Sequence, residues 1–130
     1  MISFSEFKEI SDTLGLEIAE DENHKEWNMY IDSPLFADSH NRAIDGAVLA
    51  LSFSNQSIWL YNHIEIVEYP WDNTPHWHLA AEIDNEFLNG KKYVNKEKSF
   101  FIEEIRKIMV DVKNKQEEVE LEKIKGDFKC

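Results

Sequence analysis

The stretch that decides the fold is AVLALSF at positions 47–53, followed by the polar NQS at 55–57 and by IWLYNHIEIV at 58–67. In the first part the odd positions are apolar, and this period of two is typical of a half-buried strand. The second part is rich in β-branched and aromatic residues, which favour strands. The polar segment between them suits a turn. We therefore predict an antiparallel hairpin with strands over about 46–54 and 57–68.

One further strand is predicted on each side of this hairpin in the sequence. After a break that contains Pro70 and Pro75, alternation resumes at Trp77, which predicts a strand over about 76–83. Before the hairpin, a shorter alternating run predicts a strand over about 27–32, preceded by a polar stretch at 20–26. Together these elements predict a meander within an antiparallel sheet of three to five strands.

Helices are predicted at both ends of the chain. Ser3 and Glu6 have the spacing of a capping box and Gly15 suits a helix C-terminus, so we expect a helix over 3–15. A longer helix is expected over about 97–124, with one apolar face at helical spacing: Phe101, Ile105, Ile108 and Val112. Both helices should pack on one face of the sheet. The predicted fold class is therefore α+β.

Length and composition indicate one domain. A chain of 130 residues with 42% hydrophobic residues can build one core, so we treat 1–130 as a single domain. The one cysteine, Cys130, excludes an intrachain disulfide and a thiolate metal cluster. The N-terminal sequence has no signal-peptide pattern, and no apolar run is long enough to cross a bilayer. We expect a cytoplasmic protein with no membrane partner.

The negative charge of the chain is concentrated in its first 90 residues. They contain 17 acidic residues against three basic ones, Lys8, Lys25 and Arg42, whereas the last 40 residues have a small basic excess. No Lys or Arg occurs between Arg42 and Lys91. Such a surface repels phosphate backbones and attracts basic proteins. It argues against direct nucleic-acid binding.

The predicted strands bring aromatic, histidine and acidic residues to one face. If Val67 lies opposite His76 and Glu65 opposite His78, Tyr61 lies opposite Glu82. This face would then carry Trp59, Tyr61, His63, Glu65, His76, His78 and Glu82. The other face would carry Ile58, Leu60, Ile64 and Ile66 and could accept both helices.

Several interpretations of this face stay open. His76 and His78, two apart on a strand, could bind a divalent transition metal together with His63 and Glu65. An acid and base site built on His78 is also conceivable, but phosphoryl chemistry usually needs cations that this region lacks. The face could equally be a half-exposed sheet surface whose side chains pack across strands.

As a protein-binding surface, the region offers the aromatic and acidic residues typical of interfaces. The predicted partner-binding residues are Trp59, Tyr61, Glu65, Glu68, Trp71, Asp72, His76, His78, Glu82 and Asp84. No catalytic residue or cofactor is predicted, and His76 and His78 are the candidates should a metal bind.

In its size, acidity and lack of catalytic motifs, the chain resembles the immunity proteins of bacterial toxin systems, including those of contact-dependent growth inhibition. This resemblance implies an inhibitor, monomeric or homodimeric, that neutralises a basic partner such as a nuclease-type toxin by covering its active site with carboxylates and aromatics. One alternative is a phage anti-defence protein that mimics the charge of DNA. Another is a small metal-binding or hydrolytic protein centred on His76 and His78, since the run at 72–78 is loosely similar to a short motif in some small toxins.

Overall fold

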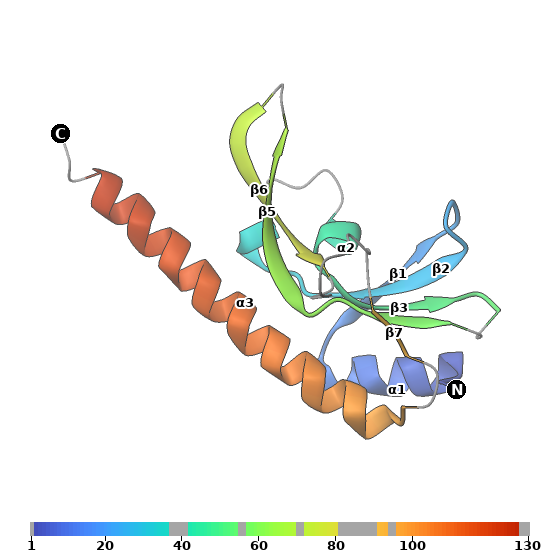
Figure 1. Cartoon of the computed structure of the whole chain (residues 1–130). Coiled ribbons are helices and arrows are strands. Elements are labelled where there is room, and N and C mark those ends of the chain that lie inside the picture. Colours follow the sequence, from blue (N-terminus) through green and yellow to red (C-terminus); the bar gives the residue numbers. More distant parts are fainter. Residues whose placement is uncertain are drawn as a thin grey trace.

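The computed structural model describes residues 2–36, 42–54, 57–69, 72–80, 91–93 and 96–127, and has the α+β fold predicted from the sequence (Figure 1). Its helical elements are α1 (Phe4–Leu14), the short 3₁₀ helix η1 (Pro34–Phe36), α2 (Arg42–Asp45) and α3 (Lys98–Asp127). Its strands are β1 (Glu17–Asp21), β2 (Glu26–Tyr30), β3 (Ala47–Ser52), β4 (Ile58–Leu60), β5 (His63–Tyr69), β6 (Asp72–Ala80) and β7 (Lys91–Tyr93).

The larger sheet has five strands in the order β1-β2-β3-β4-β7, and each strand is antiparallel to its neighbours. Its centre is β3, which lies within the predicted strand at 46–54. Five of the six β3 residues are buried, because this strand is covered on both faces. In register, Asn28 of β2 lies opposite Ala50 of β3, and Ala50 lies opposite Trp59 of β4. These three positions therefore share one face of the sheet.

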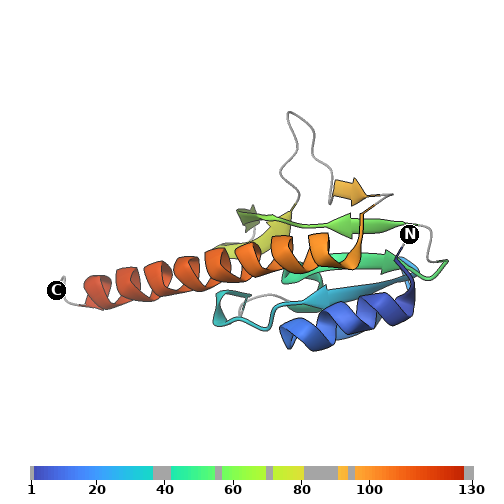
Figure 2. The same ribbon diagram turned by 90° about the horizontal axis from the view of Figure 1, so that it is seen from below.

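Helices α1 and α3 lie side by side against one face of this sheet, as predicted (Figures 1 and 2). The buried core between helices and sheet contains the four α3 residues predicted from helical spacing. It is completed by Phe7 and Ile10 of α1 and by Met29, Leu49, Leu51, Ile58 and Leu60 of the sheet. Because these residues come from segments more than 100 positions apart, the core joins both ends of the chain to the central strands.

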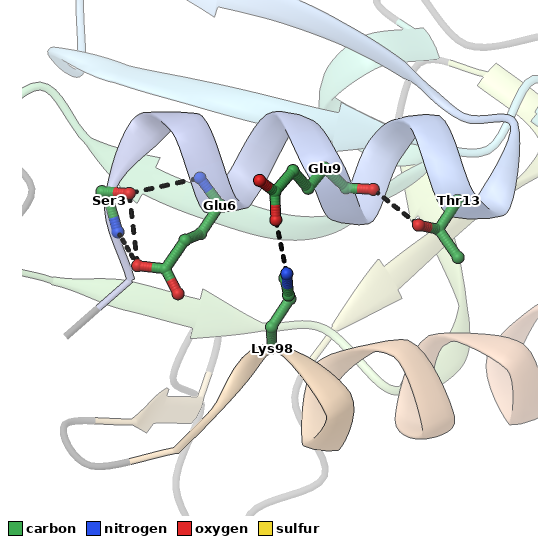
Figure 3. Close-up of polar contacts among 5 residues, drawn as sticks. All are labelled: Ser3, Glu6, Glu9, Thr13 and Lys98. Carbon is green, nitrogen blue, oxygen red and sulfur yellow. Dashed lines mark hydrogen bonds and ion pairs between the residues drawn. The ribbon is translucent and has the colours of Figure 1, made fainter.

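The capping prediction for the first helix is confirmed (Figure 3). The Ser3 hydroxyl accepts a hydrogen bond from the Glu6 backbone N–H at 3.2 Å, and a Glu6 carboxylate oxygen accepts one from the Ser3 backbone N–H at 3.3 Å. Gly15 ends the helix with φ of 67°, a left-handed conformation that favours glycine. An ion pair between Lys98 and Glu9 then links the start of α3 to α1 (Figure 3).

The strand predicted over 57–68 is interrupted in the structure. It ends as β4 at Leu60 and begins again as β5 at His63, which belongs to a different sheet. The Tyr61 backbone N–H still donates to the Val48 carbonyl at 2.9 Å, so the chain leaves β3 only after this residue. Alternation of apolar and polar residues indicates which side chains share a face, but it does not indicate which strands pair. The sequence pattern alone therefore could not locate this bend.

The smaller sheet is the hairpin of β5 and β6. Contrary to the predicted break at 70–75, β6 begins at Asp72 and includes Pro75. A two-stranded sheet leaves one edge of each strand unpaired, so a proline without an N–H is tolerated there. The prediction that Ile66 is covered by the helices was also wrong, since Ile66 is 50% exposed. Ile64 does pack partly against the core.

The second half of α3 extends beyond the larger sheet (Figures 1 and 2), and its contacts with β6 and with the segment before η1 lie at Lys115 and Gln116. The Lys115 ammonium lies 5.3 Å from the centre of the Trp77 ring, and the Ser33 hydroxyl donates to the Gln116 side-chain oxygen at 3.1 Å. Among the parts of the chain that the structure describes, no helix has the length and apolar character required to cross a bilayer.

Two short strands, β1 and β7, were not predicted. In β1 the sequence EIAED contains only two apolar residues, because this strand forms an edge of the larger sheet. Charged residues are common on edge strands, where they discourage pairing with another chain. Within the polar stretch at 20–26, only residues 22–25 form the turn between β1 and β2.

Candidate functional site

The β5–β6 hairpin has the register that the sequence analysis predicted. Glu65 lies opposite His78, and Val67 lies opposite His76. The Glu65 carboxylate lies between two imidazoles, with an oxygen 3.2 Å from Nε2 of His78 and the other oxygen 3.8 Å from Nε2 of His63. These three partly exposed side chains therefore form one polar cluster on the predicted face.

His76 does not lie on an exposed surface, contrary to the prediction. Only 8% of this residue is exposed. The reason is tertiary packing, since β6 lies against both η1 and α2 and the side of the hairpin assigned to solvent is partly covered. His76 is therefore unsuited to contact a partner directly. Among the described residues, no group of three close metal-binding side chains contains His76 or His78.

The other predicted partner-binding residues are dispersed. Trp59 belongs to β4 of the larger sheet and is half-buried, while Tyr61 follows it in the bend before β5. The prediction that both share one sheet face with the hairpin histidines was wrong, because the two sheets separate at this bend. Glu68 and Asp72 belong to β5 and β6. Trp71, Glu82 and Asp84 lie outside the described residues, as does the predicted pairing of Glu82 with Tyr61.

Two of the predicted residues, Tyr61 and His78, instead line a cleft of about 250 Å³. The β1–β2 hairpin forms one wall of this cleft, α2 with the start of β3 forms a second, and Tyr61 with β6 forms a third. The lining residues are Asp21, His24, Glu26, Asn28, Ile44, Asp45, Ala47, Tyr61, His78, Leu79 and Ala80. This described lining contains three carboxylates and no Lys or Arg.

The turn between β1 and β2 holds the acidic wall in place. One Asp21 carboxylate oxygen accepts a hydrogen bond from the His24 backbone N–H at 3.1 Å, and the other lies 2.7 Å from Nδ1 of His24. Lys25 adopts φ of 54°, which reverses the chain direction into β2. Alternation along β2 then places Glu26 and Asn28 on the same side of the strand, and both line the cleft.

Burial and charge shift the ionisation of the groups in this cleft. Desolvation raises the pKa of Glu26, and the nearby His24 only partly offsets this effect. Desolvation also acts on Asp21, but hydrogen bonds from His24 outweigh it and lower the pKa of Asp21. The hydrogen bond to Asp21 in turn raises the pKa of His24. Burial, with a contribution from the charge of Glu26, raises the pKa of Tyr61 to about 12.

Sequence reasoning missed four of these residues: Asp21, His24, Glu26 and Asp45. The stretch at 20–26 was interpreted only as a polar connection. A signal was available, because the Asp21-x-x-His24 spacing suits a turn closed by a carboxylate, and alternating residues flank it on both sides. Nothing in the sequence, however, indicated that this turn lies opposite β6.

The arrangement is chemically suited to hold a positive charge. Asp21, His24 and Glu26 each offer a ligand atom, and these atoms lie within 4.8 Å of one another. Such a group could bind a divalent metal or an organic cation that donates several hydrogen bonds. The described lining offers histidine and carboxylates for proton transfer but contains no serine, threonine, cysteine or lysine that could act as a nucleophile.

Comparisons of the chain with protein-family models, with curated proteins and with solved structures give no match.

Proposed function

We propose that this chain is a small acidic inhibitor of the immunity-protein type, which binds and neutralises a basic protein, in particular a nuclease-type toxin. The observation that carries the proposal is the acidic cleft between the β1–β2 hairpin and β6. Its described lining combines Asp21, Glu26 and Asp45 with an aromatic ring and contains no Lys or Arg.

The physical basis is complementarity with a nucleic-acid-binding protein. Such a protein presents Lys and Arg side chains to phosphates, and carboxylates form charge-assisted hydrogen bonds with the same side chains. The net charge of −12 steers a basic partner toward the inhibitor over longer distances. Rapid association is what neutralising a toxin requires. The same charge disfavours direct binding to the phosphate backbone of a nucleic acid.

The polar cluster of His63, Glu65 and His78 extends the acidic region beyond the cleft. Glu65 is partly exposed, as are the two imidazoles. The cluster lies beside the cleft because His78 belongs to both. A partner seated over the cleft would therefore meet a second carboxylate region on β5, and the two regions together define the proposed binding face.

The proposal is tested with the tagged full-length chain as bait in an extract of its native host. A captured basic protein is then purified, and its nuclease activity is measured against increasing amounts of the chain. We expect complete inhibition at a 1:1 ratio and binding that weakens steeply between low and high salt. Inhibition should fail for the double variant Glu26→Lys and Glu65→Lys.

Glu26→Lys and Glu65→Lys are also made singly. The matched control for each is Glu103→Lys, which makes the same charge change at an exposed position of α3, on the other side of the larger sheet. This variant should inhibit as the unmodified chain does. Circular dichroism of all variants checks that they are folded. The proposal is contradicted if binding is insensitive to salt, or if Glu103→Lys weakens inhibition as much as the double variant.

A further inference from the structure

The cleft between the β1–β2 hairpin and β6 has the size of a site for one side chain. Its volume of about 250 Å³ is below the range of roughly 300–1,000 Å³ that is usual for sites of drug-sized ligands. It is nevertheless several times the volume of about 30 Å³ that one water molecule occupies in the liquid. A long, thin side chain of a partner protein fits these limits.

The floor of the cleft contains a buried polar group that points to a ligand. Asn28 is only 4% exposed, lines the cleft and lies on the same side of β2 as Glu26. No hydrogen bond joins its carboxamide to another residue in the described part of the chain. A buried amide without a partner is unfavourable, so a ligand that donates to its oxygen would gain a hydrogen bond at this point.

The charge on the walls calls for a cation. Glu26 is partly buried and has a carboxylate that desolvation disfavours, and Asp21 and Asp45 line the same cleft. Asp21 already pairs with His24, which leaves Glu26 beside Asn28 as a further acceptor. Two acceptors next to each other match a planar group with several N–H donors better than a single ammonium.

The remaining walls distinguish an organic cation from a metal ion. Ile44, Leu79 and Ala80 are apolar, and the Tyr61 ring lies with them. A metal ion gains nothing from such walls, because it needs a shell of oxygen and nitrogen ligands. An arginine side chain makes favourable contacts with both the apolar residues and the ring, since its aliphatic stem packs on apolar groups and its guanidinium can lie against an aromatic ring.

We propose that this cleft receives the guanidinium of one arginine side chain of the protein partner, with Glu26 and the Asn28 carboxamide as its acceptors. The inference rests on the proposed function. It specifies one contact within the proposed binding face, between an arginine of the partner and this cleft. It also explains why the cleft is acidic yet partly apolar.

The test is a nuclear magnetic resonance titration of the ¹⁵N-labelled full-length chain. The probe is N-acetyl-arginine amide, and the comparison compound is N-acetyl-citrulline amide, which has a similar shape but no charge. We expect saturable shifts of the Glu26 and Asn28 amide signals with the arginine probe alone. Glu26→Gln should weaken this binding about tenfold or more, because a charged hydrogen bond is lost, and Asn28→Leu should also weaken it.

The matched control is Glu103→Gln, which removes an exposed carboxylate of α3 and should leave the binding of the probe unchanged. Equal shifts with the citrulline compound, or no saturable shift with the arginine probe, would overturn the inference. A parallel titration with Zn²⁺ addresses the metal alternative. Tight 1:1 zinc binding that Asp21→Asn and His24→Ala both abolish, and that the arginine probe does not displace, would also overturn it.

These results are separable from the test of the proposed function. If a basic protein is inhibited at a 1:1 ratio but the arginine probe causes no saturable shift, the assignment of the cleft fails and the inhibitor function stands. If the probe binds as expected but the captured basic protein is not inhibited, the function fails and the cleft remains a guanidinium site.

Discussion

Truncation of Ile105 tests whether α3 docks on the larger sheet, on which the shape of the whole molecule depends. Ile105 is 0% exposed and lies in the core with α1 and the central strands, whereas Val110 on the same helix is 58% exposed. Ile105→Ala and Val110→Ala both replace a β-branched residue by alanine within α3. Their intrinsic effects on helix formation are therefore similar, and the difference between them reports burial.

The expected magnitude follows from the burial of the two side chains. Removing a buried isoleucine side chain costs about 2–5 kcal/mol, while an exposed substitution changes stability by no more than about 0.5 kcal/mol. With an unfolding entropy of about 2.1 cal/mol/K per residue over 130 residues, 1 kcal/mol corresponds to a shift in Tm of about 4 °C. We therefore expect Ile105→Ala to lower Tm by about 7–18 °C and Val110→Ala to change it by less than about 2 °C.

Thermal unfolding followed by circular dichroism at several scan rates measures both variants, and urea unfolding gives an independent value of the free energy. If the two variants unfold within about 2 °C of each other, the packing of α3 against the sheet is wrong. In that case the arrangement of the core shown by the structure would have to be abandoned.

Three further predictions concern the helix cap and the titrating groups of the cleft. Ser3→Ala should lower the free energy of unfolding by about 0.5–2 kcal/mol, as measured by urea unfolding, whereas Ser5→Ala in the first turn should not, and equal effects would refute the capping role. Ultraviolet absorbance should show a tyrosine that titrates near pH 12 and disappears in Tyr61→Phe; because this pKa is raised in the folded state, its contribution to stability is present below pH 10 and is lost as pH rises toward 12. In Asp21→Asn the pKa of His24 should fall, as measured from its imidazole proton signals, because the hydrogen bond that raises it is weakened; an unchanged value would show that the two side chains do not pair in solution.

Local signals predicted α1 and α3 well, because the information that ends a helix lies within a few residues of its ends; the short η1 and α2 were not predicted. Ser3 and Glu6 cap α1, Gly15 terminates it, and helical spacing identified the buried face of α3. The pairing of Glu65 with His78 was also predictable, since the two strands are close in sequence and their patterns allow few registers.

The candidate cleft could not be predicted in the same way. Its walls come from residues 21–28, 44–47, 61 and 78–80, which no local pattern connects. The bend after Leu60 moves β5 and β6 out of the larger sheet, and the hairpin then packs on η1 and α2. That packing buries His76, which the alternation of polar and apolar residues had assigned to solvent.

The sequence by itself determined the α+β class, the two terminal helices and their core faces, the central strand and the excess of acidic charge. These features depend on periodicity, capping and composition, all of which act over short distances along the chain. Only the tertiary structure decided that the chain forms two sheets, that Asp21, His24 and Glu26 face Tyr61 and His78 across one cleft, and that Asn28 lies buried at its floor. The physical reason is that burial and proximity between distant segments depend on how the faces of whole elements pack, and a pattern within one element does not specify its neighbour.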